Sequence, residues 1–105
     1  MNTTIREHIE SILPELITIR HDIHAHPELG YKEERTSGVI QQFLSDNSIP
    51  FEAGLAKGTG VLAHIEGESG KAVGLRADID ALPITEENSF DWKSVHEGCM
   101  HACGH

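Results

Sequence analysis

The spacing of apolar residues changes near the middle of this chain, and that change limits the folds it can adopt. Apolar residues recur every three or four positions from Ile5 to Ile23, which predicts a first helix. Thr4 and Glu7 form a capping-box pattern at its start. Pro14 should kink this helix or begin a new one. Pro27 should end it near His26, because the residue before a proline avoids the helical conformation.

A second helix is expected over residues 32–46, with Asn47 and Pro50 as its stop. Its apolar stripe consists of Val39, Ile40, Phe43 and Leu44. From Phe51 the apolar runs become short, and the runs at 59–66 and 71–78 are separated by the turn-like sequence Gly67-Glu-Ser-Gly70. Two helices followed by three strands predict an α/β fold, with two N-terminal helices packed on a mixed β-sheet.

The charge of the chain excludes several classes of partner. Eight Lys and Arg face 17 Asp and Glu, a formal net charge of −9, which disfavours nonspecific binding to nucleic acid or to an anionic membrane. No apolar run approaches the roughly 20 residues of a membrane span, and the N-terminus lacks the order of a signal peptide. Both cysteines lie close together near the C-terminus, unlike a disulfide framework, so we expect a reducing, cytoplasmic location.

Residues 96–105 hold the densest group of side chains that bind metals. They are His96, Cys99, His101, Cys103 and His105. Thiolate and imidazole are the usual zinc ligands, although the spacing is not that of a zinc finger, so a site completed by residues from elsewhere fits better than a local one. The alternative is a loop with incidental His and Cys. Because termini fray, a domain rarely ends on such a segment, and we expect the chain to be part of a larger protein.

Two carboxylates, Asp78 and Asp80, come at the end of the last predicted strand. In a strand they would point to the same face and would repel each other unless a cation or a proton lay between them. The ends of strands are also where α/β enzymes place their chemistry. The alternative is a solvated turn closed by Leu82 and Pro83.

Other polar residues are expected to be structural. His24 and His26 fall at the end of the first helix, where residues two apart point away from each other and cannot chelate one ion. Arg20 and Glu28 should pair or cap locally. The pairs Glu33-Glu34 and Glu86-Glu87 are expected on solvated faces.

Five segments in order resemble one known family. They are Arg20-His-Asp-Ile-His-Ala-His-Pro-Glu-Leu-Gly30, Glu34-Arg-Thr36, Gly58-Thr-Gly-Val61, Leu75-Arg-Ala-Asp-Ile-Asp-Ala-Leu-Pro-Ile84 and Met100-His-Ala-Cys-Gly-His105. The chain resembles the N-terminal part of the aminoacylase/carboxypeptidase-like metallopeptidases, in the branch with hippurate hydrolase, N-acyl-amino-acid amidohydrolases and auxin-conjugate hydrolases. The resemblance implies that residues 1–105 are the first portion of a three-layer α/β/α, zinc-exopeptidase-like catalytic domain. The rest of that domain and a dimerisation or lid domain are expected outside the chain.

The resemblance also implies roles for particular residues. Cys103 and His105 match metal ligands of this branch. Asp80 matches a carboxylate that lies behind the ligands and orients one of them. Asp78 stands where other branches carry a metal-binding His, so no ligand role passes to it, and Cys99 has no role in the family that we can assign.

The implied activity is metal-dependent hydrolysis of the amide bond of an N-acyl amino acid or a peptide-like small molecule. Two divalent ions (Zn, Mn, Co or Ni) would polarise the carbonyl and lower the pKa of a water, and a glutamate from further along the chain would move its proton. The complete protein is expected to be a homo-oligomer. The 105-residue chain alone is expected to be inactive.

The sequence also allows two other hypotheses. The chain could be a stand-alone, non-enzymatic module that binds metal or oligomerises to cover an open sheet face. Alternatively, Cys99 and Cys103 could form a redox-active disulfide, although their spacing allows one only in some backbone geometries.

Overall fold

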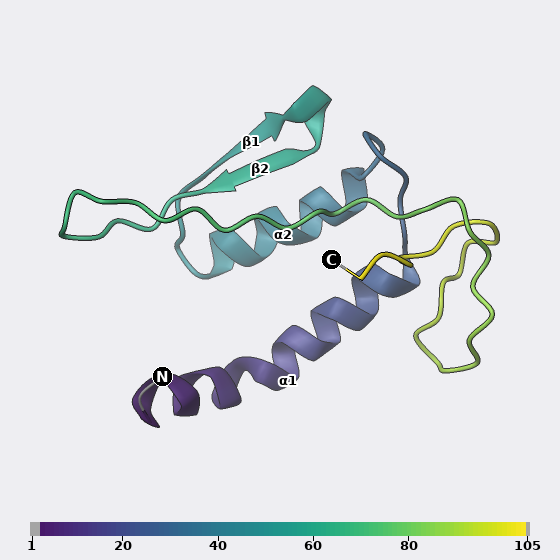
Figure 1. Cartoon of the computed structure of the whole chain (residues 1–105), viewed down its shortest axis with the longest axis horizontal. Helices are drawn as coiled ribbons and strands as arrows, with labels where there is room; N and C mark the ends of the chain where they lie inside the picture. Colours follow the sequence, from purple (N-terminus) through teal and green to yellow (C-terminus); the bar gives the residue numbers. More distant parts are fainter. Residues whose placement is uncertain (1–2, 105) are drawn as a thin grey trace.

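The structure is a computed structural model that describes residues 3–104. Helix α1 spans Thr3–Ala25 and helix α2 spans Glu34–Asp46. Strands β1, Phe51–Leu55, and β2, Gly60–Ala63, follow, with a short 3-10 turn at Ala56–Gly58 between them. In Figure 1 the two helices diverge, with the strands and α2 on one side and the N-terminal half of α1 extending away from them.

Helix α1 confirms the predicted start and end of the first helix within a residue. It passes through Pro14 as one continuous helix, so no new helix begins there. The proline leaves the carbonyl of Glu10 without its usual helical partner. Because this stretch of α1 is exposed on the described chain, water can satisfy that carbonyl. No helix within residues 3–104 is both long and apolar enough to cross a membrane.

Helix α2 begins two residues later than the sequence pattern predicted. Tyr31 takes a left-handed conformation, with φ of 66°, in the turn that precedes it. The helix ends where Asn47 and Pro50 predicted, and the backbone N–H of Asn47 donates to the carbonyl of Phe43 over 3.1 Å.

Within residues 3–104 the sheet is a two-stranded antiparallel hairpin rather than a mixed sheet of three strands. Phe51 pairs with Ala63 and Glu52 pairs with Leu62, and an irregularity precedes the pair of Leu55 with Gly60. A Cβ at Gly60 would lie 3.1 Å from the backbone of Leu55, a contact so tight that this close approach favours glycine.

The predicted third strand at 71–78 is wrong for the described chain. The backbone turns at Gly70, as the turn-like sequence predicted, and returns past β2 and α2 without regular structure (Figure 1). A strand is defined by hydrogen bonds to a neighbouring strand, and no segment of residues 3–104 pairs with this one. Its Val73 and Leu75 side chains are 91% and 97% exposed.

The best-packed region lies where the two helices approach the segment around Ala81. Ala81 is buried, and so are the polar residues Glu33, Thr36, Ser37 and Thr59. This region joins three segments that the sequence analysis singled out, and it positions the candidate site.

Candidate functional site

Backbone hydrogen bonds bring three of the motif segments side by side. The N–H of Ala81 donates to the carbonyl of Glu28 over 2.7 Å, and Leu29 and Ala81 form an isolated parallel bridge. On the other side of this segment, Leu82 and Met100 exchange two backbone hydrogen bonds of 2.9 and 3.0 Å. The segment after Asp80 therefore lies between the turn that follows α1 and the Cys- and His-rich tail.

Asp80 and Asp78 both line a hollow of 320 Å³. The walls also include Gly30, Tyr31, Glu33, Thr59 and Gly60. The Asp80 carboxylate lies next to Gly30, where an added Cβ would be 3.8 Å from its Oδ2. Asp78 forms an ion pair of 2.7 Å with Arg76. The common strand face predicted for the two carboxylates does not arise from a strand, although both reach the same hollow.

Glu33 corrects the prediction that the Glu33-Glu34 pair is solvated. Glu33 is only 5% exposed, and its Oε2 accepts a 2.5 Å hydrogen bond from the Thr59 hydroxyl. This bond links the start of α2 to the residue before β2. Glu34 is exposed, as predicted.

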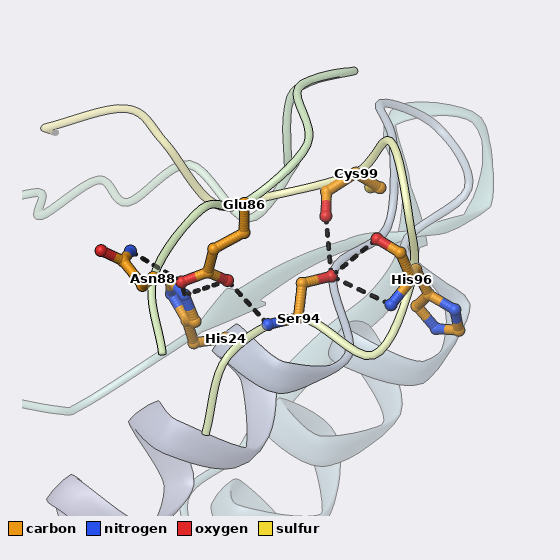
Figure 2. Close-up of polar contacts among 6 residues, drawn as sticks. All are labelled: His24, Glu86, Asn88, Ser94, His96 and Cys99. Carbon is orange, nitrogen blue, oxygen red and sulfur yellow. Dashed lines mark hydrogen bonds and ion pairs between the residues drawn. The ribbon is translucent and has the colours of Figure 1, made fainter. Parts of the chain in front are cut away.

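Glu86 corrects the prediction for the second pair in the same way (Figure 2). Its side chain is 2% exposed, and both of its carboxylate oxygens lie 3.0 Å from Nε2 of His24. The backbone N–H of Ser94 donates to Oε1 over 2.7 Å, and the Asn88 amide donates to Oε2 over 2.9 Å. Burial raises the pKa of this carboxyl, but the bonds from Asn88, Ser94 and His24 outweigh it and lower the pKa to about 2.

The segment from Glu86 to Val95 is also held on α1 by aromatic contacts. Trp92 stacks between His21 and Phe90, with ring centroids 4.1 and 3.7 Å away. The guanidinium carbon of Arg20 lies 5.3 Å from the centre of the Trp92 ring, within range of a cation–π contact. The backbone N–H of Val95 donates to the carbonyl of Ala25, the last residue of α1, over 2.9 Å.

His24 and His26 have separate partners, as their helical spacing predicted. His24 faces Glu86, whereas Nδ1 of His26 lies 2.8 Å from the carbonyl of Asp22. Arg20 and Glu28 do not pair with each other. Glu28 instead caps α2, because its carboxylate accepts hydrogen bonds from the backbone N–H groups of Arg35 and Thr36. The predicted capping is therefore confirmed for Glu28.

The cysteines and histidines of the tail occupy different environments. Cys99 is partly buried, and that burial, with the negative charge of Glu28, raises the pKa of its thiol. A protonated thiol is a poor nucleophile, which disfavours the redox reading for Cys99. Cys103 is exposed, and no disulfide joins it to Cys99. The predicted ligand His105 lies outside the described residues.

His101 carries a buried ring nitrogen, Nε2, with no hydrogen-bond partner within residues 3–104. Burial lowers the pKa of this imidazole, and the nearby His24, 6.3 Å away between ring centroids, lowers it further. The neutral ring keeps one nitrogen able to accept or donate a bond. Buried polar atoms are rarely left unpaired, so this nitrogen calls for a partner from a bound group, a water or another part of the protein.

The donors of the tail suit a divalent metal, but only as part of a site. A thiol and an imidazole two residues apart are good ligands for zinc and similar ions. Within residues 3–104, however, no three His, Cys, Asp or Glu side chains are grouped so as to hold an ion. Any metal at Cys103 therefore needs ligands beyond those residues.

Sequence reasoning missed Glu33 and Glu86 as packed groups. Glu33 directly precedes the motif that starts at Glu34, and Glu86 lies two residues after the motif that ends at Ile84. Their position beside these motifs was the sequence signal that could have indicated that both glutamates are packed.

Comparison with known proteins shows that this chain is similar to part of several metallopeptidases and hydrolases. Residues 74–105 match the family described as Peptidase family M20/M25/M40. The crystal structure of the Bacillus subtilis YXEP protein, described as a dinuclear metal-binding peptidase of the M20 family, aligns with 90% of this chain at a TM-score of 0.84 and 41% identity. A second solved structure, from methicillin-resistant Staphylococcus aureus, aligns with 99% of the chain at a TM-score of 0.88 and 37% identity.

Curated sequences give the same result. The chain is 47% identical over 92 residues to a hydrolase of Staphylococcus epidermidis and 45% identical over 95 residues to the N-acetyldiaminopimelate deacetylase of Listeria innocua. These matches cover 87% and 90% of this chain but only 24% and 26% of the relatives, so the chain spans about a quarter of their length. The resemblance to the metal-dependent amidohydrolases is confirmed, as is the α/β class of the fold.

Proposed function

We propose that the whole protein containing this chain is a metal-dependent hydrolase of amide bonds, and that residues 1–105 form the N-terminal portion of its catalytic domain. The observation that carries the proposal is the match of this fold, at 41% identity, to a solved dinuclear metal-binding peptidase. The convergence of the segments around Glu28, Asp80 and Met100 supports it, because these lie in three of the motifs on which the resemblance rests.

Cys103 and His105 are the proposed metal ligands. The thiol of Cys103 is exposed, three residues after Met100, whose backbone is fixed to Leu82. Bound divalent ions would polarise the substrate carbonyl and lower the pKa of a water. The thiolate favours zinc, while manganese, cobalt and nickel remain options for a mixed set of ligands.

Asp80 is proposed to orient an imidazole ligand by accepting its second N–H. Carboxylates in such positions fix the ring orientation and raise the basicity of the ligand. The next residue, Ala81, is buried, and its backbone N–H donates to the carbonyl of Glu28. The backbone that carries the Asp80 carboxylate is therefore held in place. The Asp80 side chain still faces the hollow beside Gly30.

The proposed substrates are N-acyl amino acids or related small amides. The name of the Listeria innocua relative, an N-acetyldiaminopimelate deacetylase, supports this class. We further propose that the complete protein acts in the cytoplasm as a homo-oligomer. The thiol state of both cysteines is compatible with a reducing compartment.

The test is hydrolysis of a panel of N-acetyl and N-benzoyl amino acids by the whole protein, with metal content measured on the same samples. Cys103→Ala should lower kcat/KM by about 100-fold or more and reduce bound metal, and Asp80→Asn should lower it by about 10- to 100-fold. Cys99→Ala is the matched control and should retain metal and activity. Full activity and metal content in Cys103→Ala would contradict the proposal.

A further inference from the structure

A continuous path of hydrogen bonds runs from the end of α1 to the Cys- and His-rich tail. It starts at His24, passes through the Glu86 carboxylate to Ser94, and ends on the backbone of His96 and Cys99 (Figure 2). None of these residues has a role in the proposed chemistry. The path nevertheless ends four residues before the proposed ligand Cys103.

The Glu86 end of the path needs a carboxylate. Oε1 accepts from Ser94, Oε2 accepts from Asn88, and His24 lies 3.0 Å from both oxygens. A glutamine would replace one acceptor by an NH₂ group, which can no longer accept the bond that Ser94 or Asn88 donates on that side. The side chains of His24 and Glu86 are 13% and 2% exposed, so little water is available to replace a lost bond.

The Ser94 end of the path fixes the tail. The Ser94 hydroxyl lies 2.7 Å from the carbonyl of Cys99 and 2.9 Å from that of His96, and it accepts a 3.1 Å bond from the N–H of His96. The next residue, Met100, pairs with Leu82 through two backbone bonds. The tail is therefore held at two consecutive residues immediately before it reaches residues 101–103.

We propose that Glu86 is a positioning residue that acts through Ser94 to set the path of residues 99–103, and so the orientation of Cys103 toward a metal. The inference rests on the proposed function for its metal-binding part. A purely structural role, in which Glu86 only attaches its loop to α1, is the competing explanation. The two differ in what happens at the tail when the link through Ser94 is removed.

The experiment uses the metal-free whole protein titrated with cobalt(II), whose bond to a cysteine thiolate gives a charge-transfer absorption band. Cys103→Ala identifies the band that belongs to this thiolate. Ser94→Ala and Glu86→Gln should weaken cobalt binding by about 10- to 100-fold and diminish the band, as is typical for groups that orient ligands. Glu87→Gln, an exposed neighbouring glutamate, is the matched control and should bind cobalt as the unmodified protein does.

Hydrogen exchange in the metal-free protein gives an independent measurement. Amides of residues 99–102 should exchange faster in Ser94→Ala and Glu86→Gln, while the amides of α2 should keep their rates. Ser94→Ala removes only the hydroxyl group that contacts the backbone of His96 and Cys99, and it keeps the backbone N–H that donates to Glu86. It therefore tests the Ser94 end of the path, while Glu86→Gln tests the other end.

Each outcome has a distinct meaning. Variants that melt at a lower temperature but keep the cobalt affinity, the band and the exchange rates of the tail would overturn the positioning role. An unmodified protein without a Cys103-dependent band would overturn the metal assignment of the proposed function instead. In that case the exchange rates at 99–102 alone would decide whether Glu86 positions the tail.

Discussion

The ionised carboxylate of Glu86 has hydrogen-bond partners in His24, Asn88 and Ser94. Protonation of the carboxyl group would weaken some of these bonds. Its folded-state pKa is about 2, against an ordinary value of 4.5. Because the folded value is the lower one, ionised Glu86 stabilises the protein above about pH 4.5, and this contribution disappears as the pH falls from 4.5 toward 2.

The predicted pH dependence can be measured as a difference between two proteins. At pH 7 the whole protein should exceed Glu86→Gln in free energy of unfolding by on the order of 2 kcal/mol. The difference should shrink when urea unfolding is repeated at pH 4 and pH 3. Glu87→Gln should follow the unmodified protein at every pH, and a difference that stays constant with pH would show that the charge of Glu86 is not what stabilises the loop.

At the scale of elements, the sequence pattern located both helices and the strand around 60–63, because their signals are local. Capping residues, prolines and helical spacing act within a few positions of the element they define. The burial of Glu33 and Glu86 depends on Thr59 and His24, which are 26 and 62 positions away in sequence. No local pattern can reveal such partners, and a Glu-Glu pair resembles a solvated face wherever it occurs.

Helix α2 shows how a distant residue can take over a local function. Its own N-cap, Glu33, makes no capping bond with its side chain. The carboxylate of Glu28 instead accepts bonds from the backbone N–H groups of Thr36 and Arg35 over 2.7 and 3.0 Å and from the Thr36 hydroxyl over 2.8 Å. Its negative charge also interacts favourably with the positive end of the helix dipole.

Glu28→Ala in the whole protein should therefore cost about 1–2 kcal/mol of stability and loosen the first turn of α2. Hydrogen exchange should show faster exchange at the amides of Arg35 and Thr36, with the middle of α2 less affected. Glu34→Ala, at an exposed position in the same turn, is the control and should change these rates little. Equal effects of the two variants would mean that Glu28 does not cap the helix.

At the scale of the whole molecule, the described chain leaves large apolar side chains uncovered. Six on α1 are exposed: Ile5, Ile9, Ile12, Leu13, Leu16 and Ile17. A second apolar surface lines a hollow of 530 Å³ between α2, β2 and the returning segment, where Val73, Leu75 and Ile79 lie. Apolar exposure on this scale is typical of surfaces that are covered in the complete protein. The relatives, about four times as long, have the additional chain to do so.

Side chains in the segment 71–78 alternate along the sequence as they would in a strand with one face covered by further chain. Lys71, Val73, Leu75 and Ala77 would share one face of such a strand. Its sequence therefore predicts a strand that residues 3–104 do not pair, and pairing with chain outside those residues would reconcile the two observations. The stand-alone module reading predicts instead that a second copy of this chain covers the same surface.

Leu75→Asp separates these possibilities. If further chain of the whole protein buries Leu75, the substitution should lower the free energy of unfolding of the whole protein by about 2–4 kcal/mol, because it places an unpaired carboxylate among apolar side chains. Lys71→Asp introduces the same group at the start of the segment and should cost much less. Sedimentation of the 105-residue chain tests the alternative hypothesis. A dimer of this chain that Leu75→Asp dissociates would favour the stand-alone module. A whole protein unaffected by Leu75→Asp would show that this side chain stays in water, as it does in the described chain, and that 71–78 is not a buried strand.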